Sequence, residues 1–467
     1  MKIRDKIGAF DLEVYPNFTL IAIKGLNGTL VRYVIKGEDN RLSKDDIKSL
    51  RALLSNITVF GFNSLNYDLP LMLMAMQGAT ARAICKAGND IIANEQHHYL
   101  TMRKLDLNVP NWLSHFDISD VAPGVRVSLK LYGGRIHAPK LQDLPVSPNT
   151  LLSNEQMRLI TEYNVNDLDT TILLYNEIEA AIGLRAELSQ QYKFDFMSKS
   201  DPQVAEHLIC LEVEKAIGKQ IQKPSSAPSF IKYKLPEFIQ FKDTQLQAIL
   251  AFISKCEFEI DGRGSIKLPK VLSDAVIVLG STEYQMGIGG LHSKDSKLKV
   301  IPKADEILAD RDVTSYYPNI VLNSRLFPKQ MGTKFLDVYQ MIVNDRVHSK
   351  HLVPILEKRL ANGENVADEL KYHSNRAASY KIVANGSFGK FGSQYSNLYS
   401  PDLLAQVTLT GQLSLLMLIE QLELAGIKVV SANTDGFVSL LHSSLYDVYD
   451  TICFDWELAT GFVLEET

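Results

Sequence analysis

The sequence has few cysteines and lacks the spacings with which cysteines bind metals. Only four of its 467 residues are cysteine, at positions 85, 210, 256 and 453, and no two of them form a CxxC pair. This argues against a zinc or iron–sulfur module and fits a reducing cytoplasm. No stretch approaches the roughly 20 apolar residues of a membrane span, and the first ten residues lack an apolar core of signal-peptide length. We therefore expect a cytoplasmic protein with no membrane partner.

Basic residues are scarce towards the end of the chain. Residues 401–467 hold one Lys or Arg, Lys428, against ten acidic residues, whereas residues 320–400 hold 11 basic residues against six acidic ones. The net charge of −5 argues against a simple cationic DNA-binding module. A basic stretch followed by an acidic one is what a phosphate-binding element beside a metal-binding sheet would show. Random variation of surface charge explains the same pattern equally well.

The bulk composition is that of a globular protein, because 46% of the residues are hydrophobic and 22% are charged. A chain of this length is too long for one core, and about three domains are expected. Near the N-terminus, residues 7–14 and 18–23 read as antiparallel strands. Asp11 and Glu13 stand two apart on the first of them and so point to one face. Residues 155–174 show helical periodicity, with these inward positions: Leu159, Ile160, Tyr163, Ile172 and Leu173.

Three short segments of the first 195 residues combine carboxylates with amide or tyrosine side chains: Asp11-Leu-Glu13, Asn63-Ser-Leu-Asn-Tyr67-Asp68 and Tyr163-Asn-Val-Asn-Asp167. Mg²⁺ and Mn²⁺ prefer hard oxygen ligands, and two such ions can activate a water and stabilise both oxygens of a phosphodiester displacement. Taken singly, each segment is as well explained by a solvated strand, a helix N-cap or an exposed helix face.

Three further segments follow downstream: Asp312-Val-Thr-Ser-Tyr-Tyr-Pro318, Lys381-Ile-Val-Ala-Asn-Gly-Ser-Phe-Gly389 and Asn433-Thr-Asp435-Gly436. The first reads as the end of a strand, residues 308–314, with Pro318 near the start of a helix. The second has helical spacing, with Lys381, Asn385 and Phe388 on one face. The third is a tight turn between two strands within residues 428–441, and taken alone it is ordinary hairpin chemistry.

In this order the last three segments resemble motifs A, B and C of the family B DNA polymerases, DxxSLYP, KxxxNSxYG and DTDS. The first three resemble the Exo I, II and III motifs of the proofreading exonuclease in the same family. Tyr284–Gly290 loosely resembles the Tyr/Gly-Gly segment that joins the two modules. The resemblance implies a multidomain α/β and α+β chain. Its expected parts are an RNase H-like 3′→5′ exonuclease domain (1–195), a connecting N-terminal palm region (196–300), palm with motif A (301–325), short helical fingers with motif B (326–388) and palm with motif C (389–467).

For the exonuclease module, the resemblance implies that four carboxylates, Asp11, Glu13, Asp68 and Asp167, are catalytic and hold two Mg²⁺ ions, with Mn²⁺ as the alternative. By the same resemblance Tyr163 positions the attacking water. The resemblance also implies that Asn63 and Tyr67 hold the single-stranded DNA 3′ end and that Lys140 lies near the scissile phosphate.

For the polymerase module, the resemblance implies that Asp312, the backbone carbonyl of Val313 and Asp435 hold two further metal ions. Lys381 would bind the incoming triphosphate, and Tyr317 would exclude a 2′-hydroxyl from the nucleotide site. Further substrate contacts are expected from Asn385, Phe388, Arg376 and Lys371. Each of these lysines and arginines would also suit an exposed helix.

Five positions depart from the family motifs. Tyr316 replaces leucine, Gly386 replaces serine, and Phe388 replaces tyrosine. In motif C, Asn433 replaces the first aspartate and Gly436 the serine. Because Asn433 carries no negative charge, we expect Asp312 and Asp435 to hold the metals with reduced affinity.

The sequence thus predicts a bacteriophage-like replicative DNA polymerase with proofreading, in the host cytoplasm if viral. Its expected partners are a DNA primer–template and deoxynucleoside triphosphates. Few residues follow Gly436, and Lys428 is the only basic residue after position 400, whereas the family continues with a basic segment and a DNA-gripping thumb. We therefore expect a second polypeptide to supply the thumb. Two alternatives remain open: an enzyme that is only an exonuclease, and a non-catalytic DNA-binding or assembly subunit.

Overall fold

The computed structural model describes residues 6–94, 98–123, 127–224, 228–294 and 298–466. They form two compact units, Met1–Asp201 and Pro202–Thr467, where length alone predicts about three domains. The first unit ends at Asp201, and the domain boundary predicted at residue 195 stays a prediction.

The first unit is built on a five-stranded sheet with the order β3-β2-β1-β4-β5. Strand β2 runs antiparallel to its neighbours β1 and β3, and β4 and β5 run parallel to β1. The two strands predicted at residues 7–14 and 18–23 are confirmed. The strands are β1 Ile7–Tyr15, β2 Phe18–Gly25, β3 Leu30–Lys36, β4 Thr58–Gly61 and β5 Ser114–Asp117.

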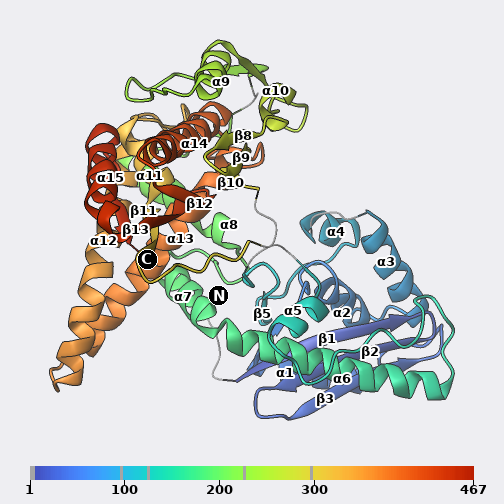
Figure 1. Cartoon of the computed structure of the whole chain (residues 1–467). Coiled ribbons are helices and arrows are strands. Elements are labelled where there is room, and N and C mark those ends of the chain that lie inside the picture. Colours follow the sequence, from blue (N-terminus) through green and yellow to red (C-terminus); the bar gives the residue numbers. More distant parts are fainter. Residues whose placement is uncertain (1–5, 95–97, 124–126, 225–227, 295–297, 467) are drawn as a thin grey trace. The chain divides into compact units, whose positions relative to one another are not determined.

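Helices cover both faces of this sheet. Successive side chains of β1 point to opposite faces, so they pack into two separate cores. Phe10 and Leu12 pack into one core, with residues of α1, α2 and α3. Ala9 and Tyr15 pack into the other core, with α6, which Figure 1 shows running along the sheet. The helices are α1 Lys44–Asn56, α2 Asp68–Met76, α3 Ala81–Asn94, α4 His98–Lys104, α5 Leu129–Arg135, α6 Asn154–Glu177 and α7 Glu179–Tyr192.

Helix α6 confirms the predicted helix over residues 155–174, and it begins at a capping box formed by Ser153 and Gln156. Its buried face includes Ile160, as predicted. The inward placement of Leu159 and Leu173 is wrong, because these side chains are 38% and 37% exposed. Leu159 stands next to Ile160, and one residue turns the helix by about 100°, away from the core.

The second unit is built on a seven-stranded antiparallel sheet with the order β14-β11-β13-β12-β10-β9-β8. The predicted motif A strand and the predicted motif C hairpin are confirmed as β11 and as β12 with β13. Its strands are β8 Ile277–Leu279, β9 Thr282–Met286, β10 Leu291–Ser293, β11 Glu306–Val313, β12 Lys428–Asn433, β13 Gly436–His442 and β14 Leu464–Glu466, with β6 Phe230–Lys232 and β7 Glu257–Glu259 forming a separate pair.

Helix α14, Pro401–Leu424, forms much of the core of the second unit. It is long and apolar enough to span a membrane, so the expectation that no stretch approaches that length is wrong. However, 94% of its most apolar 18-residue window is buried inside the structure, as in the core helix of a globular fold. Helices α12 and α13 form a long pair (Figure 1), and α13 contains motif B. The other helices are α8 Asp201–Ile217, α9 Thr244–Lys255, α10 Lys270–Ser273, α11 Tyr316–Asn323, α12 Lys334–Ala361, α13 Ala367–Phe391 and α15 Tyr446–Thr460, with a 3₁₀ turn at Ser443–Leu445.

Candidate functional site

Three carboxylates from distant parts of the sequence converge in the first unit. Asp11 and Glu13 point from β1 towards α6, which brings Asp167, and the ligand oxygens of the three lie within 4.8 Å of one another. Asp68, the first residue of α2, lies beside them and accepts a hydrogen bond from the backbone N–H of Leu12 (3.1 Å). The structure thus brings together the four carboxylates that the sequence singled out.

The carboxylates of this cluster share a strongly unfavourable electrostatic environment. Burial, and then the neighbouring carboxylates, raise the pKa of Asp11 and of Glu13 well above their ordinary values. Burial also raises the pKa of Asp68 to about 7 and that of Asp167 to about 6. Close, partly desolvated carboxylates favour either protons or a cation. Their all-oxygen donor set fits Mg²⁺ or Mn²⁺.

Two neighbours on α6 hold individual carboxylates of the cluster. Asn164 is fully buried, and its Nδ2 donates to Oδ2 of Asp11 (2.7 Å). The hydroxyl of Tyr163 bonds to the carboxylate of Asp167, one helical turn away, and lowers its pKa. Sequence reasoning missed Asn164, although its spacing of three residues from Asp167 places it on the same helix face.

The loop that leads to Asp68 is fixed by a second residue that the sequence did not reveal. Asp117, at the end of β5, is 3% exposed. Its carboxylate accepts hydrogen bonds from the backbone N–H groups of Asn63 (3.0 Å), Leu65 (2.9 Å) and Ser119 (2.9 Å). Asn63 has a left-handed backbone, with φ 58°, which the bonds to Asp117 help to hold. An acidic residue at the end of a buried strand was the available signal.

The other predicted DNA contacts lie at differing depths. Tyr67 precedes α2 and is partly buried, and burial followed by the charge of Asp68 raises its pKa, so its hydroxyl stays protonated. A Cβ atom at Gly88 of α3 would lie 2.9 Å from this hydroxyl oxygen, so the glycine makes room for the ring. Lys140 is exposed on the segment between α5 and α6.

In the second unit, strand pairing brings the motif A and motif C aspartates together. Asp312 lies near the end of β11, opposite Gly436 of β13, and Asp435 lies in the turn just before Gly436. The backbone N–H of Val313 donates to the carbonyl of Asp435 (2.8 Å). Burial, and then the charge of Asp435, raise the pKa of Asp312. Two carboxylates that lie together at the end of a strand can hold a hard divalent ion.

The motif C turn is tight. Thr434 has a positive φ of 59°, which is unfavourable for a β-branched residue and is found mainly at functional sites. A Cβ atom at Gly436 would overlap the carboxylate of Asp312, so glycine at this position leaves space for that side chain. Asn433 is exposed, and its Oδ1 accepts a hydrogen bond from the hydroxyl of Thr434 (3.3 Å).

A cavity of about 320 Å³ is lined by Asp435, the neighbour of Asp312 in this site. Arg346 of α12, another residue that sequence reasoning missed, contributes a cation to its lining. Its Nη1 donates to the hydroxyl of Ser315 (3.0 Å), and burial lowers its pKa. The basic stretch 320–400 was the available signal, but it did not single out this arginine. The remaining lining residues come from motifs A, B and C: Ser315, Tyr316, Tyr317, Pro318, Ala384, Asn385, Phe388, Thr434 and Asp435.

The basic residues that were predicted on motif B lie outside this lining. Lys381 is exposed on α13. Arg376 forms an ion pair with Asp345 of α12, and its guanidinium lies over the ring of Tyr380, 4.9 Å from the centroid. Lys371 lies near the start of α13. Contacts of these three residues with a triphosphate stay predictions.

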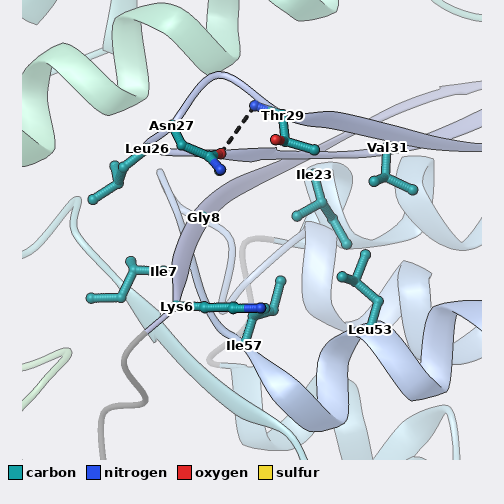
Figure 2. Close-up of a pocket in the computed structure, with 11 residues that line it drawn as sticks. Lys6, Ile7, Gly8, Ile23, Leu26, Asn27, Thr29, Val31, Leu53 and Ile57 are labelled. Atoms are coloured by element: carbon teal, nitrogen blue, oxygen red, sulfur yellow. Dashed lines mark hydrogen bonds between the residues drawn. The ribbon is translucent and has the colours of Figure 1, made fainter.

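A larger cavity, of about 490 Å³, lies at the start of β1 (Figure 2). Apolar side chains such as Ile23, Val31 and Leu53 form most of its wall. Lys6 is the titratable side chain in the described lining, and Asn27 accepts a hydrogen bond from the backbone N–H of Thr29 (3.1 Å). Among the residues that the structure describes, the lining of this cavity therefore lacks the paired carboxylates that characterise the two sites above.

No protein-family model matches the chain, and no curated protein matches it. Among solved structures, the chain is similar to the family B DNA polymerase from the hyperthermophilic archaeon Pyrobaculum calidifontis, with a TM-score of 0.52 and 14% sequence identity. The similarity covers 99% of this chain and 56% of that chain. The chain therefore shares the fold of about half of a family B DNA polymerase.

Proposed function

We propose that the chain carries out template-directed DNA synthesis and removes misincorporated nucleotides by 3′→5′ exonucleolytic cleavage. The observation that carries the proposal is the pairing, in one chain, of two separate carboxylate sites. One is the Asp11, Glu13 and Asp167 cluster of the first unit. The other is the pair Asp312 and Asp435, beside a cavity of nucleotide size in the second. The shared fold supports this function at the level of a DNA polymerase.

In the first unit, each residue has a role that follows from its position. The cluster of Asp11, Glu13 and Asp167, with Asp68 beside it, would hold divalent ions. At both sites, such ions would supply Lewis-acid stabilisation of the oxygens that attack and leave phosphorus. Tyr163, bonded to Asp167, presents its hydroxyl at the edge of the cluster, where it can orient a water. Helices on both faces of the mixed sheet support the RNase H-like interpretation of this unit.

In the second unit, Asp312 and Asp435 would hold the ions, and the cavity beside them would hold the nucleotide. Arg346 supplies positive charge where phosphates would lie, and positioned cations stabilise phosphoryl transfer. The ring of Tyr317 packs against Phe388, 4.3 Å between centroids, and forms one wall of the cavity. An apolar ring there can stack on a sugar or base and can exclude a 2′-hydroxyl.

A second candidate is an enzyme that is only an exonuclease. Asn433 favours it, because this neutral side chain stands where the family motif has an aspartate and makes only a local bond to Thr434. Under this alternative the second unit binds DNA but transfers no nucleotide.

Two variants, assayed with a 5′-labelled primer–template and Mg²⁺, separate the candidates. The double variant Asp11→Ala with Glu13→Ala should lose degradation of single-stranded DNA by at least about 100-fold and keep primer extension. Asp312→Ala should keep degradation and lose extension. The matched control is Asp310→Ala, which removes an exposed carboxylate from the same strand and should keep both activities.

Three outcomes of this assay decide between the readings. Extension absent from the wild-type chain, with degradation intact, would establish the exonuclease-only candidate. Degradation at the wild-type rate by the double variant would refute the assignment of the first site. Primer extension by the Asp312→Ala variant would refute the assignment of the second site. A bacteriophage source, a cytoplasmic location and a second polypeptide with a thumb stay predictions.

A further inference from the structure

The turn that joins β9 and β10, residues 287–290, is bound to the core by one helix. Gln412 of α14 binds Gly287 twice, since its Oε1 accepts from the backbone N–H and its Nε2 donates to the carbonyl, each at 2.9 Å. The hydroxyl of Thr408, one turn earlier on α14, donates to the carbonyl of Ile288 (3.1 Å). Gln412 and Thr408 are 1% and 4% exposed. Three hydrogen bonds from buried side chains therefore fix this turn.

The same stretch of α14 also supports the two tyrosines of motif A. The hydroxyl of Tyr316 donates to the carbonyl of Gly411 (2.6 Å). A Cβ atom at Gly411 would lie 3.2 Å from Cε1 of Tyr317, so the ring of Tyr317 packs close to the helix. Residues 408–412 thus position both the tyrosine rings and the turn 287–290.

A hydrogen bond joins Tyr317 to the turn 287–290. The hydroxyl of Tyr317 donates to the carbonyl of Gly289 (2.7 Å). Tyr317 also lines the nucleotide-sized cavity. Its ring is therefore held at one end by the backbone of α11 and at the other by the turn. A ring held at both ends cannot swing between rotamers without breaking a bond.

We infer that Gln412 and Thr408 are positioning residues for sugar selection. They bind Gly287 and Ile288, in the turn whose Gly289 carbonyl fixes the ring of Tyr317. The inference rests on the proposed polymerase function and deepens it. A nucleotide with a 2′-hydroxyl needs the ring to move aside, and the anchored turn opposes that movement. Release of the turn should therefore admit ribonucleotides more readily while leaving deoxyribonucleotides little affected.

The test compares two glutamines of α14 that make the same bonds to different segments. Gln406 is 7% exposed and binds Lys234 as Gln412 binds Gly287, accepting from its backbone N–H (3.0 Å) and donating to its carbonyl (2.6 Å). Gln412→Met and Gln406→Met thus remove the same chemistry from the same helix. Only Gln412→Met should lower the ratio of kcat/KM for dATP over ATP, by about 3- to 10-fold, the range for one neutral hydrogen bond.

A double variant separates action through Tyr317 from a general loosening of the unit. Tyr317→Phe removes only the hydroxyl and should lower the ratio by a similar factor. If Gln412 acts through that hydroxyl, Gln412→Met combined with Tyr317→Phe should have the ratio of Tyr317→Phe alone. Multiplied effects in the double variant, or an equal loss of discrimination in Gln406→Met, would overturn the inference.

Two further measurements keep the test decisive. Thermal unfolding reports whether each variant folds, and Thr408→Val, which keeps the side-chain shape, replaces Gln412→Met if that variant does not fold. If the wild-type chain incorporates no nucleotide, the proposed function fails, and the same proteins are compared by calorimetric binding of dATP and ATP. A dATP preference that Gln412→Met and Tyr317→Phe reduce supports the inference. A preference that they leave unchanged, or no preference, refutes it.

Discussion

Replacement of Asp117 should disable the exonuclease site without touching any of its carboxylates. The Asp117 side chain accepts hydrogen bonds from the backbone N–H groups of Asn63 and Leu65. Both residues lie in the loop that leads to Tyr67 and Asp68. Asp117→Ala leaves those groups without their acceptor, and the left-handed backbone of Asn63 loses its restraint. The loop should then relax towards ordinary backbone angles and carry Asp68 away from the other carboxylates.

The magnitude follows from the bonds that are lost. A hydrogen bond to a charged acceptor contributes about 1.5–3 kcal/mol. The bond to Ser119, two residues away in sequence, is a local turn bond. The two bonds to the loop therefore contribute about 3–6 kcal/mol, reduced to about 3 kcal/mol because water can reach the partly buried loop. Asp117→Asn keeps the acceptor at Oδ1 for Asn63. It also removes a buried carboxyl whose pKa burial raises. This substitution should therefore destabilise the loop by only about 1 kcal/mol.

The assay is degradation of a labelled single-stranded oligonucleotide at saturating Mg²⁺, with kcat and KM measured separately. A displacement of about 1 Å at a catalytic group can cost about 100-fold in rate. We therefore expect kcat to fall about 100-fold in Asp117→Ala and about 10-fold in Asp117→Asn. Primer extension should be unchanged in both variants, because Asp117 belongs to the first unit.

The matched control is Asp120→Ala, which removes an exposed carboxylate three residues further along. Hydrogen exchange should show faster exchange in residues 62–67 of Asp117→Ala and native exchange in β1. If Asp117→Ala degrades DNA with the kcat and KM of Asp120→Ala, Asp117 does not position the loop. If β1 exchanges as fast as the loop, the whole unit has unfolded, and the comparison then depends on Asp117→Asn.

Two further predictions concern charge and space at the two sites. The pKa of Asp68 is raised from 3.8 to about 7, so the fold favours the protonated form of this carboxyl. In EDTA the first unit should therefore lose stability as the pH rises from about 4 to 7. For this group the loss should be at most about 4 kcal/mol. Mg²⁺ should raise the thermal unfolding temperature of this unit at pH 8 and have little effect at pH 5, and stability that rises with pH in EDTA would contradict this. In the second unit, Gly436→Ala should displace the Asp312 carboxylate and slow primer extension at least about 10-fold, with exonuclease activity as the internal reference. Gly389→Ala, where an added Cβ meets open space, is its control, and equal extension rates in the two variants would show that Asp312 does not need the space at Gly436.

Local patterns were sufficient to predict the elements that carry the sites. The alternation in β1 places Asp11 and Glu13 on one face, and α6 covers residues 155–174, where the periodicity predicts a helix. The strand and turn chemistry of motifs A and C also appears where expected, in β11 and in the turn between β12 and β13. In each case the information lies within a few residues, because strand and helix periods relate near neighbours.

The residues that support the sites could not be predicted in this way. Asp117 reaches a loop more than 50 residues earlier in the chain, and Arg346 reaches Ser315 from another helix. Gln412 acts on Gly287, 125 residues away. None of these positions carries a local pattern, since an acid at a strand end, an arginine on a helix and a glutamine in an apolar helix each have many ordinary roles. Only tertiary packing identifies their partners.

The departures from motif C show why a motif alone does not define the charge of a site. Asn433 removes one negative charge from the turn, and from the sequence this predicts weaker metal binding. However, β14 pairs with β11 so that Glu465 lies opposite Asp312, and the charge of Glu465 contributes to the raised pKa of Asp312. The negative charge of Glu465 therefore replaces, near Asp312, part of the negative charge that is absent at Asn433. Lys350 forms an ion pair with the same glutamate (3.5 Å). Because the electrostatics of this site depend on a glutamate 153 residues after Asp312, the effect of Asn433 is determined by the whole sheet rather than by the four residues of the turn.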